Sequence, residues 1–478
     1  MSRPSLQDAC TKIVATVGPA CESTEQLATL IVSGVDVFRI NTAHGERDQH
    51  SAVLQRIREA SETTGFPVGV LLDLAGPKIR LGQLVEDPLT CDLGMKVTFV
   101  RGEAQARHEF SSTYDRLIDE LESGDRVMLA DGTIALKVTE TQDDRAECEV
   151  TAAGLLRSRQ GINLPGVKLS VEALLPRDID NAIWAASQGI DFISLSFVRS
   201  PEDVRKLKRL LAEHGSDAMV VAKIEKPEAL DCLESIVEEA DGVMVARGDL
   251  GVEIDVAETP VAQKRIIRVC REQMKPVIVA TQMLESMHQN TRPTRAEVSD
   301  VANAILDGTD ACMLSGETAI GNHPALAVAT MNRIMLCTER DMLQHARPDD
   351  RINDRVYPIT CAVTESATDI AEAIGAKLII ISTRSGNTAW VKSQSRSKIP
   401  TIGASESPAT LRRLNLLWGI KPLHADDLDE TTSFIDRMCG WGRQNAGLQP
   451  GDQLVFVTGT GVVEKAHNLI VVHTVEEI

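Results

Sequence analysis

The sequence predicts an α/β protein built on a closed parallel barrel of the (β/α)8 type. Eight short apolar segments rich in β-branched residues recur within the first 314 residues, and segments with helical periodicity separate them. Buried parallel strands have nearly continuous apolar sequences, and eight strand–helix units in succession favour a closed barrel over an open sheet. An aromatic content of only 3% agrees with a core of aliphatic side chains.

The barrel strands are predicted from these apolar runs. In chain order they are Lys12–Val17, Val35–Ile40, Val68–Asp73, Asp191–Ser196, Ala218–Ile224, Gly242–Ala246, Pro276–Ala280 and Ala311–Leu314. One intervening helix has a clear predicted start, with Ser200 as its N-cap, Pro201 as its first residue and Asp203 as its third.

The alternation is interrupted after the third strand. Arg126–Ala130 and Thr133–Val138 read as two strands joined by an Asp131-Gly132 turn, which is typical of a β-hairpin. We therefore expect residues 86–165 to form an inserted small β-barrel domain that acts as a lid. The barrel itself is then assigned to residues 1–85 and 166–346.

Alternation of strands and helices resumes near the C-terminus. Strands are predicted at Lys377–Ser382, Thr401–Gly403, Gln453–Thr458 and Leu469–His473. Residues 347–478 are therefore expected to form a separate α/β domain.

The composition of the chain excludes some classes of partner and indicates its compartment. The 50 Lys and Arg and 69 Asp and Glu residues give a formal charge of −19, which argues against nucleic acid or an anionic membrane as a partner. No apolar run approaches the roughly 20 residues that cross a bilayer, and no export signal is recognisable, so we expect a cytoplasmic protein. The ten cysteines form no CxxC pair and are expected to be reduced, mostly buried thiols.

Polar residues follow the predicted strands where a barrel enzyme has its active site. Glu225 and Asp249 could share a hard divalent cation, and Lys223 beside them would meet the charge of a phosphoryl group. The cluster suits phosphoryl transfer or enolate chemistry, although any one of its residues could form only a rim salt bridge. The strand-end residues are Arg39, Asn41, Asp73, Lys78, Arg80, Lys223, Glu225, Gly248, Asp249, Thr281 and Ser315.

Nine segments, taken in order, resemble the pyruvate kinase family. The resemblance is very specific between Thr11 and Pro324 and weaker in the C-terminal domain. The segments are Thr11–Ala20, Val37–Gly45, Asp73–Arg80, Gly161–Gly166, Val221–Glu225, Met244–Gly251, Ala280–Met287, Pro293–Ala304 and Met313–Ala319.

The resemblance implies a glycolytic transfer of the phosphoryl group of phosphoenolpyruvate to ADP, giving pyruvate and ATP. It implies Mg²⁺, for which Mn²⁺ could substitute, held by Glu225 and Asp249. Lys223 would stabilise the transferring phosphoryl group and Arg39 would hold the phosphate. A homotetramer is the family's usual assembly.

The resemblance also implies the remaining substrate contacts. The backbone N–H groups of Gly248 and Asp249, together with Thr281, would receive the substrate carboxylate. Thr281 and Ser315 would relay a proton to the enolate carbon. Asn41, His44 and Arg80 would face the phosphates of ADP, although His44 taken alone fits a rim histidine equally well.

The sequence departs from the K⁺-dependent members of the family at two positions. Ala43 replaces a serine hydroxyl, and Lys78 places a tethered ammonium where those members carry a glutamate. We therefore predict that K⁺ is not required, with the Lys78 ammonium taking its place in the region of Asn41 and Asp73. The alternative is that Lys78 is a solvated rim cation and that K⁺ still binds through Asn41 and Asp73.

Two further features leave alternatives open. Gln160 replaces a lysine that commonly approaches the nucleotide, which puts nucleotide preference in doubt, although Arg159 could compensate. Thr383–Thr388 resembles the family's loop for a phosphorylated allosteric effector, and a vestigial loop is the alternative.

Two other functions compete with this interpretation. A Mg²⁺-dependent aldolase or lyase would need no ADP and therefore neither the lid nor Arg80. A non-catalytic binding protein would be expected to have lost part of the catalytic set, which is intact.

Overall fold

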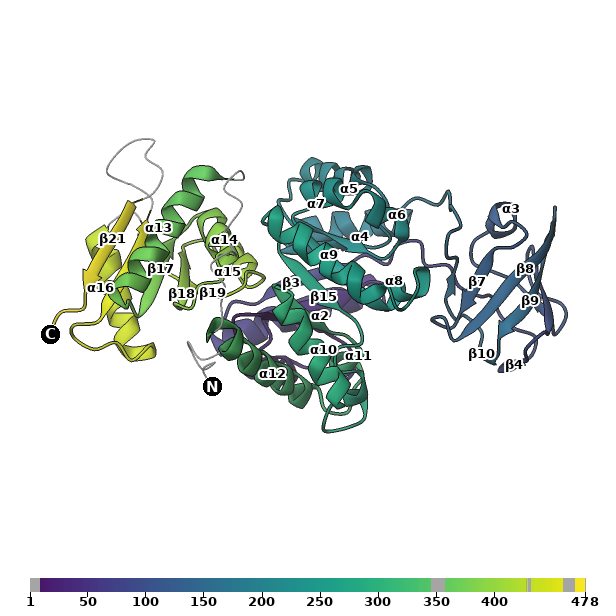
Figure 1. Cartoon of the computed structure of the whole chain (residues 1–478), viewed down its shortest axis with the longest axis horizontal. Coiled ribbons are helices and arrows are strands. Elements are labelled where there is room, and N and C mark those ends of the chain that lie inside the picture. Colours follow the sequence, from purple (N-terminus) through teal and green to yellow (C-terminus); the bar gives the residue numbers. More distant parts are fainter. Residues whose placement is uncertain (1–8, 345–356, 427, 429–430, 459–468, 478) are drawn as a thin grey trace.

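The computed structural model describes residues 9–344, 357–426, 428, 431–458 and 469–477. Figure 1 shows a central barrel with a β domain on one side and an α/β domain on the opposite side. The predicted boundary between residues 346 and 347 lies outside the described residues.

The central part is a closed parallel barrel, which confirms the predicted fold class. Its strands follow the order β1-β16-β15-β14-β13-β12-β3-β2, and β1 closes the ring by pairing with both β16 and β2. Every strand begins and ends within two residues of its predicted bounds. They are β1 (Lys12–Thr16), β2 (Val37–Asn41), β3 (Gly69–Asp73), β12 (Phe192–Leu195), β13 (Met219–Ile224), β14 (Gly242–Ala246), β15 (Val277–Ala280) and β16 (Ala311–Leu314).

Helices surround the barrel and bury one apolar side against it. The predicted start of α5 is present, because the Ser200 N–H donates to Asp203 Oδ2 at 3.0 Å. The helices are α1 (Thr24–Ser33), α2 (Arg47–Thr64), α4 (Pro176–Ser187), α5 (Pro201–Glu213), α6 (Pro227–Asp231), α7 (Leu233–Glu239), α8 (Arg247–Glu253), α9 (Thr259–Glu272), η1 (Glu285–His288), α10 (Arg295–Leu306), α11 (Gly316–Ala319) and α12 (Pro324–Gln344).

The β domain between β3 and β12 contains a six-stranded sheet, β11-β7-β8-β9-β5-β6, and a two-stranded sheet, β10-β4, around one apolar core. The predicted hairpin turn lies between β7 and β8, where Asp131 has φ +52° and Gly132 +84°. The elements are β4 (Leu89–Cys91), β5 (Lys96–Val100), β6 (Glu109–Phe110), α3 (Leu117–Glu120), β7 (Arg126–Leu129), β8 (Ile134–Gln142), β9 (Arg145–Ala152), β10 (Gly154–Leu156) and β11 (Ile162–Asn163).

The C-terminal domain has a five-stranded sheet, β19-β18-β17-β20-β21, in which only β21 runs antiparallel to its neighbour. The sequence did not predict β19, whose five residues include Pro422 and lack a continuous apolar run. The elements are α13 (Pro358–Ile374), β17 (Leu378–Ser382), α14 (Asn387–Gln394), β18 (Thr401–Ser405), α15 (Pro408–Leu414), β19 (Ile420–His424), α16 (Thr431–Asn445), β20 (Gln453–Thr458) and β21 (Leu469–Thr474).

Ion pairs join the C-terminal domain to the barrel. Arg412 Nε lies 2.7 Å from Asp191 Oδ1, and Arg396 Nη2 lies 3.0 Å from Asp310 Oδ1. Both aspartates are buried and directly precede barrel strands. The C-terminal domain therefore packs against the N-terminal ends of the strands, which leaves their C-terminal ends for a site.

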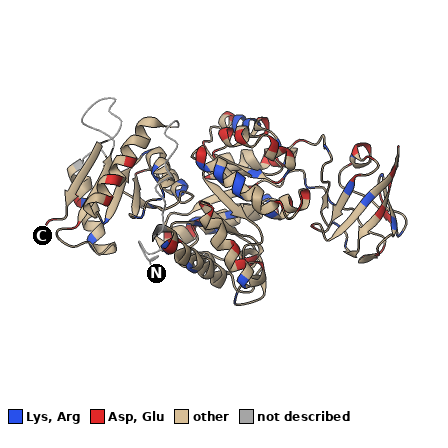
Figure 2. Cartoon of the chain, in the orientation of Figure 1, with Lys and Arg blue, Asp and Glu red and all other residues tan. Residues whose placement is uncertain are grey.

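Acidic and basic residues are intermingled on the helices around the barrel (Figure 2). Among the described helices, none combines the length and apolar character needed to span a bilayer.

Candidate active site

Strands β2, β3 and β13 carry three charged side chains to one buried cluster. Arg39 donates from Nε and Nη2 to Asp73 Oδ2 at 2.8 and 2.5 Å, and Lys223 Nζ lies 3.4 Å from Asp73 Oδ1. Burial alone would raise the pKa of Asp73, but the charges of Lys223 and Arg39 outweigh it and hold the pKa at about 2. Asp73 is therefore an anion at neutral pH that orients two cations.

Lys223 is held by acceptors at or directly after the C-terminal ends of three strands. Its Nζ lies 2.9 Å from Glu225 Oε1 and donates to Ser196 Oγ at 2.7 Å. Burial alone would lower the pKa of Lys223, but the carboxylates of Asp73 and Glu225 raise it above its usual value. The ammonium therefore stays charged, which suits it to stabilise an anion and not to act as a general base.

Glu225 and Asp249 offer oxygen ligands for a hard cation. Burial raises the pKa of Glu225, Lys223 opposes that rise and Asp249 adds to it. Glu225 Oε2 accepts from the Phe197 N–H at 2.7 Å, and Oε1 lies 2.9 Å from Lys223 Nζ. Each carboxylate oxygen keeps a further lone pair, so this buried carboxylate beside a second one fits Mg²⁺.

Lys78 lies in the same part of the site. Its Nζ is 3.4 Å from Asp249 Oδ1, and both side chains are about one third exposed or less. Asn41 Oδ1 accepts from the Ala43 N–H at 3.1 Å, while Asp73 is paired as described above. Asn41, Asp73 and Lys78 were predicted to form the monovalent-cation region. Among them, the Lys78 side chain is directed toward Asp249, a predicted Mg²⁺ ligand.

Thr281 adopts a strained conformation at the end of β15. Its φ is +71°, which is rare for a β-branched residue. The Gly248 N–H donates to Thr281 Oγ1 at 2.7 Å, and that hydroxyl donates to the Ala280 carbonyl at 2.6 Å. The Gly248 N–H is therefore occupied here, and a carboxylate could reach it only after the Thr281 side chain moves.

Arg247 supports this strained residue, a role that the sequence did not reveal. Its Nη2 donates to the Thr281 carbonyl at 2.8 Å, and its Nη1 pairs with Asp300 Oδ1 at 2.7 Å. In the sequence, only the position of Arg247 directly before Gly248 and Asp249, at the end of a predicted strand, could have pointed to a role in the site.

Ser315 follows β16 at the same rim. Its Oγ is buried and has no hydrogen-bond partner among the described residues, while its N–H donates to Glu317 Oε2 at 2.8 Å. An unengaged buried hydroxyl can exchange a proton with a ligand or water.

The residues predicted to face a nucleotide are not joined to one another as a group. Arg80 donates to the Arg159 carbonyl at 3.2 Å, at the base of the lid. The His44 N–H donates to the Asn41 carbonyl at 3.4 Å, and the His44 side chain is exposed. In the described chain no hydrogen bond or ion pair links Arg80 to either residue.

Gln160 is oriented within the lid. Its Oε1 accepts from the Arg157 N–H at 2.7 Å.

A second buried network connects the lid to the barrel, and sequence reasoning missed it. Glu253 Oε1 accepts from Lys226 Nζ at 2.6 Å and from Asn163 Nδ2 at 3.0 Å. Glu253 ends α8, Lys226 directly precedes α6, and Asn163 belongs to β11 of the lid. Lys226 directly follows Glu225, but nothing in the sequence indicates that the lid reaches it.

The predicted effector segment, Thr383–Thr388, lies in the C-terminal domain between β17 and α14. The Gly386 N–H donates to Thr383 Oγ1 at 3.0 Å, and Ser385 and Asn387 are exposed. A cavity of about 270 Å³ borders Ser385, Gly386 and Asn387.

The fold and the site together define a class of protein. It is a barrel enzyme with charged residues gathered at the C-terminal ends of its strands and with a β domain inserted after the third strand.

Comparison with known proteins gives the family. The model of the pyruvate kinase barrel domain matches residues 9–328, and that of the pyruvate kinase alpha/beta domain matches residues 361–473. Pyruvate kinases of Corynebacterium efficiens and Mycobacterium tuberculosis are each 41% identical over 98% of both chains. The crystal structure of a pyruvate kinase from Cryptosporidium parvum matches with a TM-score of 0.88 and 34% identity, covering 98% of this chain and 96% of the other.

The chain belongs to the pyruvate kinase family and is a kinase, an enzyme of the transferase class. The predicted family and enzyme class are thereby confirmed.

Proposed function

We propose that the chain transfers the phosphoryl group of phosphoenolpyruvate to ADP, giving pyruvate and ATP in glycolysis, and that it does so with Mg²⁺ and without K⁺. The observation that carries this proposal is the buried cluster in which Asp73 and Glu225 hold Lys223 charged. A fixed, desolvated ammonium stabilises a transferring phosphoryl group more than a solvated one.

Glu225 and Asp249 would hold Mg²⁺, or Mn²⁺ in its place, and this ion would neutralise charge on the substrate oxygens. Arg39 would bind the phosphate, because Asp73 fixes its guanidinium at the end of β2. Lys223 would stabilise the negative charge of the phosphoryl group during transfer. Phosphoryl transfer depends mainly on such positioning and electrostatic stabilisation.

The substrate carboxylate would bind at the N-terminus of α8. On binding, it would take over the Gly248 N–H from Thr281 Oγ1, and the Asp249 N–H would be its second donor. The released Thr281 hydroxyl and the unpaired Ser315 hydroxyl would then carry a proton to the enolate carbon.

ADP would bind between the barrel rim and the lid, with its phosphates near Asn41, His44 and Arg80. The hydrogen bond from Arg80 to the lid supports this placement, because the lid would then close over the nucleotide. Gln160 and Arg159 border the same region and would set the nucleotide preference.

Lys78 supports K⁺ independence. Its ammonium lies 3.4 Å from Asp249 Oδ1, so a fixed positive charge already stands beside the proposed Mg²⁺ ligands. Asp73, which could otherwise attract a monovalent cation, is neutralised by Arg39 and Lys223.

The proposal extends to location, assembly and regulation. We expect a homotetramer in the cytoplasm, with a phosphorylated allosteric effector bound at Thr383–Thr388 beside the neighbouring cavity. The exposed side chains of Ser385 and Asn387 in that loop have the chemistry to bind phosphate.

The substitution Lys223→Met tests the proposed chemistry. It should lower kcat about 10³-fold or more, because it removes a charge that acts on the transferring group, and leave Mg²⁺-dependent binding of phosphoenolpyruvate nearly unchanged. Pyruvate formation and calorimetric binding give the two readouts. The control is Lys206→Met on α5, whose exposed ammonium pairs with Glu172. Unchanged turnover in Lys223→Met would contradict the assignment.

A further inference from the structure

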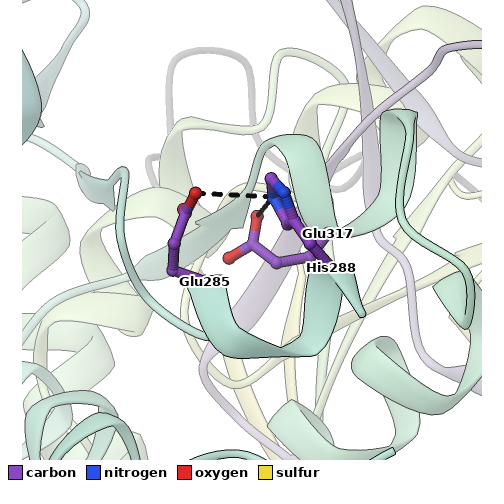
Figure 3. A group of neighbouring side chains, drawn as sticks. All are labelled: Glu285, His288 and Glu317. Carbon is purple, nitrogen blue, oxygen red and sulfur yellow. Dashed lines mark ion pairs between the residues drawn. The ribbon is translucent and has the colours of Figure 1, made fainter. Parts of the chain in front are cut away.

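A second group of metal-ligating side chains lies outside the residues assigned to catalysis. Glu285 and His288 belong to η1, after β15, and Glu317 belongs to α11, after β16. His288 Nε2 lies 3.7 Å from Glu285 Oε1 and 4.0 Å from Glu317 Oε2, and one ligand atom from each residue lies within 4.8 Å of the others. Figure 3 shows both carboxylates directed toward the imidazole ring.

The imidazole has an uncommitted nitrogen at the centre of this group. His288 Nε2 is buried and has no hydrogen-bond partner among the described residues. The ring packs directly on the backbone of Gly316, where an added Cβ would lie 2.2 Å from Nε2. A buried nitrogen without a partner is unfavourable unless it binds something that the protein itself does not supply.

Glu317 is a fixed ligand. Its side chain is 1% exposed, Oε1 accepts from the Leu284 N–H at 3.0 Å, and Oε2 accepts from the Ser315 N–H at 2.8 Å. Each carboxylate oxygen retains a second lone pair, so these bonds orient Glu317 without exhausting it. Hydrogen bonds of this kind hold metal-ligating carboxylates in place.

The short helix that carries the other two ligands is also held in place. Glu297 Oε1 accepts from the Ser286 N–H at 2.7 Å and its Oε2 from Ser286 Oγ at 2.6 Å, while Met287 is fully buried. Glu285 differs, because its side chain is 57% exposed and can move. The group thus has two constrained ligands and one adjustable ligand that is open to solvent.

The local charge favours a cation. Burial raises the pKa of Glu285, His288 opposes the rise, and the negative charges of Glu317 and Glu297 add to it. In the described chain, His288 is the only basic side chain within ion-pair distance of Glu317. One imidazole cannot neutralise two carboxylates, whereas a divalent ion can.

We propose that Glu285, His288 and Glu317 bind a divalent transition-metal ion, with Zn²⁺ the best match, at a site separate from that of the catalytic Mg²⁺. Donors in a tetrahedral Zn²⁺ site lie about 3.3–3.5 Å apart, given metal–ligand bonds of about 2.0–2.2 Å. His288 Nε2 lies 3.7 Å from Glu285 Oε1 and 4.0 Å from Glu317 Oε2, and all three ligand atoms lie within 4.8 Å of one another. Binding would therefore draw the exposed Glu285 inward and shift the His288 ring toward Glu317. A water molecule completes the fourth position.

The imidazole ligand determines the class of ion. Mg²⁺ takes oxygen ligands and loses its water reluctantly, whereas imidazole nitrogen suits Zn²⁺ and its transition-metal neighbours. Bound there, the ion would clamp η1 to α11, and so join the segment after Thr281 to the segment after Ser315.

The test is titration of the full chain with Zn²⁺ by calorimetry, in excess Mg²⁺ so that oxygen-only sites are filled. We expect one site per chain, with binding at least tenfold weaker in His288→Gln and in Glu285→Gln. The exposed Glu285 makes the second variant safe for folding. The control is His424→Gln, which removes an exposed imidazole 3.6 Å from one carboxylate, that of Asp426, and should bind as the unmodified chain does.

Several results would overturn the proposal. They are no Zn²⁺ uptake by the unmodified chain, an affinity in both variants equal to that of the unmodified chain, and displacement of Zn²⁺ by stoichiometric Mg²⁺. Co²⁺ as a spectroscopic probe adds a further check, because thiolate bands in its absorption spectrum would assign the ion to cysteines instead.

Discussion

Two buried lysines of this protein differ in how far nearby negative charges compensate their own charge. Lys223 is surrounded by carboxylates that keep it charged, whereas Lys392 of α14 is buried with little compensation. Burial lowers the pKa of Lys392 from 10.5 to about 7, against the opposing charge of Glu372. The first lysine is suited to electrostatic work, and the second reduces stability.

Replacing Lys392 with methionine should stabilise the chain. Lys392 keeps its ordinary pKa of 10.5 when unfolded, so between pH 7 and pH 10.5 the unfolded state holds a proton that the folded state has lost. Stability of the unmodified chain therefore rises with pH across this window, and the full penalty is present below pH 7. We expect Lys392→Met to be about 1–3 kcal/mol more stable at pH 7, with the difference shrinking toward pH 10.

Thermal unfolding of both chains at several pH values measures this difference. The control is Lys398→Met, an exposed lysine that lines the same cavity of about 130 Å³ and should have little effect. A constant difference at all pH values would mean that Lys392 is not titrating as described.

At the scale of elements, the barrel strands were predictable and the contacts between their ends were not. Strand β14 is a continuous apolar run, and such a run is specified locally. The support of Thr281 by Arg247 depends on the register between β14 and β15, which only the folded barrel determines. β19 escaped prediction because it is an edge strand beside β18, and its own sequence, with Pro422 inside it, lacks a continuous apolar run.

In the site, too, some residues could be predicted from the sequence and others could not. Lys223, Glu225 and Asp249 could be proposed from their positions at predicted strand ends. The network of Glu253 and Asn163 could not, because it joins residues 90 positions apart and requires the lid to pack on α8.

The hydrogen bonds and ion pair of Glu253 should contribute strongly to the stability of the contact between the lid and the barrel. Glu253→Gln leaves Lys226 buried without a full countercharge, which should lower the free energy of unfolding by about 2–4 kcal/mol in denaturant titrations. The double variant Glu253→Gln, Lys226→Met should recover part of that loss, because no unpaired charge remains. The exposed Glu202→Gln, which loses pairs with Arg205 and Arg209, should cost far less, because solvent screens surface ion pairs. An equal decrease in the free energy of unfolding for Glu253→Gln and Glu202→Gln would contradict this role of Glu253.

At the scale of the whole molecule, the two ends of the barrel contact different domains. The C-terminal domain packs on the N-terminal ends of the strands through Arg396 and Arg412, which pair with buried aspartates. The lid is inserted at the opposite end, beside the site. A net charge of −19 would repel phosphorylated substrates, so the cations of the rim must attract them locally.

The central claim is phosphoryl transfer from phosphoenolpyruvate to ADP without a monovalent cation, and an initial-rate assay tests it most directly. Pyruvate formation is measured with Mg²⁺ in K⁺-free buffer and, in parallel, with added KCl at matched ionic strength. The ammonium of Lys78 beside Asp249 predicts equal rates in the two samples. A rate that appears only with KCl would contradict the role of Lys78, and no pyruvate in either sample would contradict the proposed reaction itself.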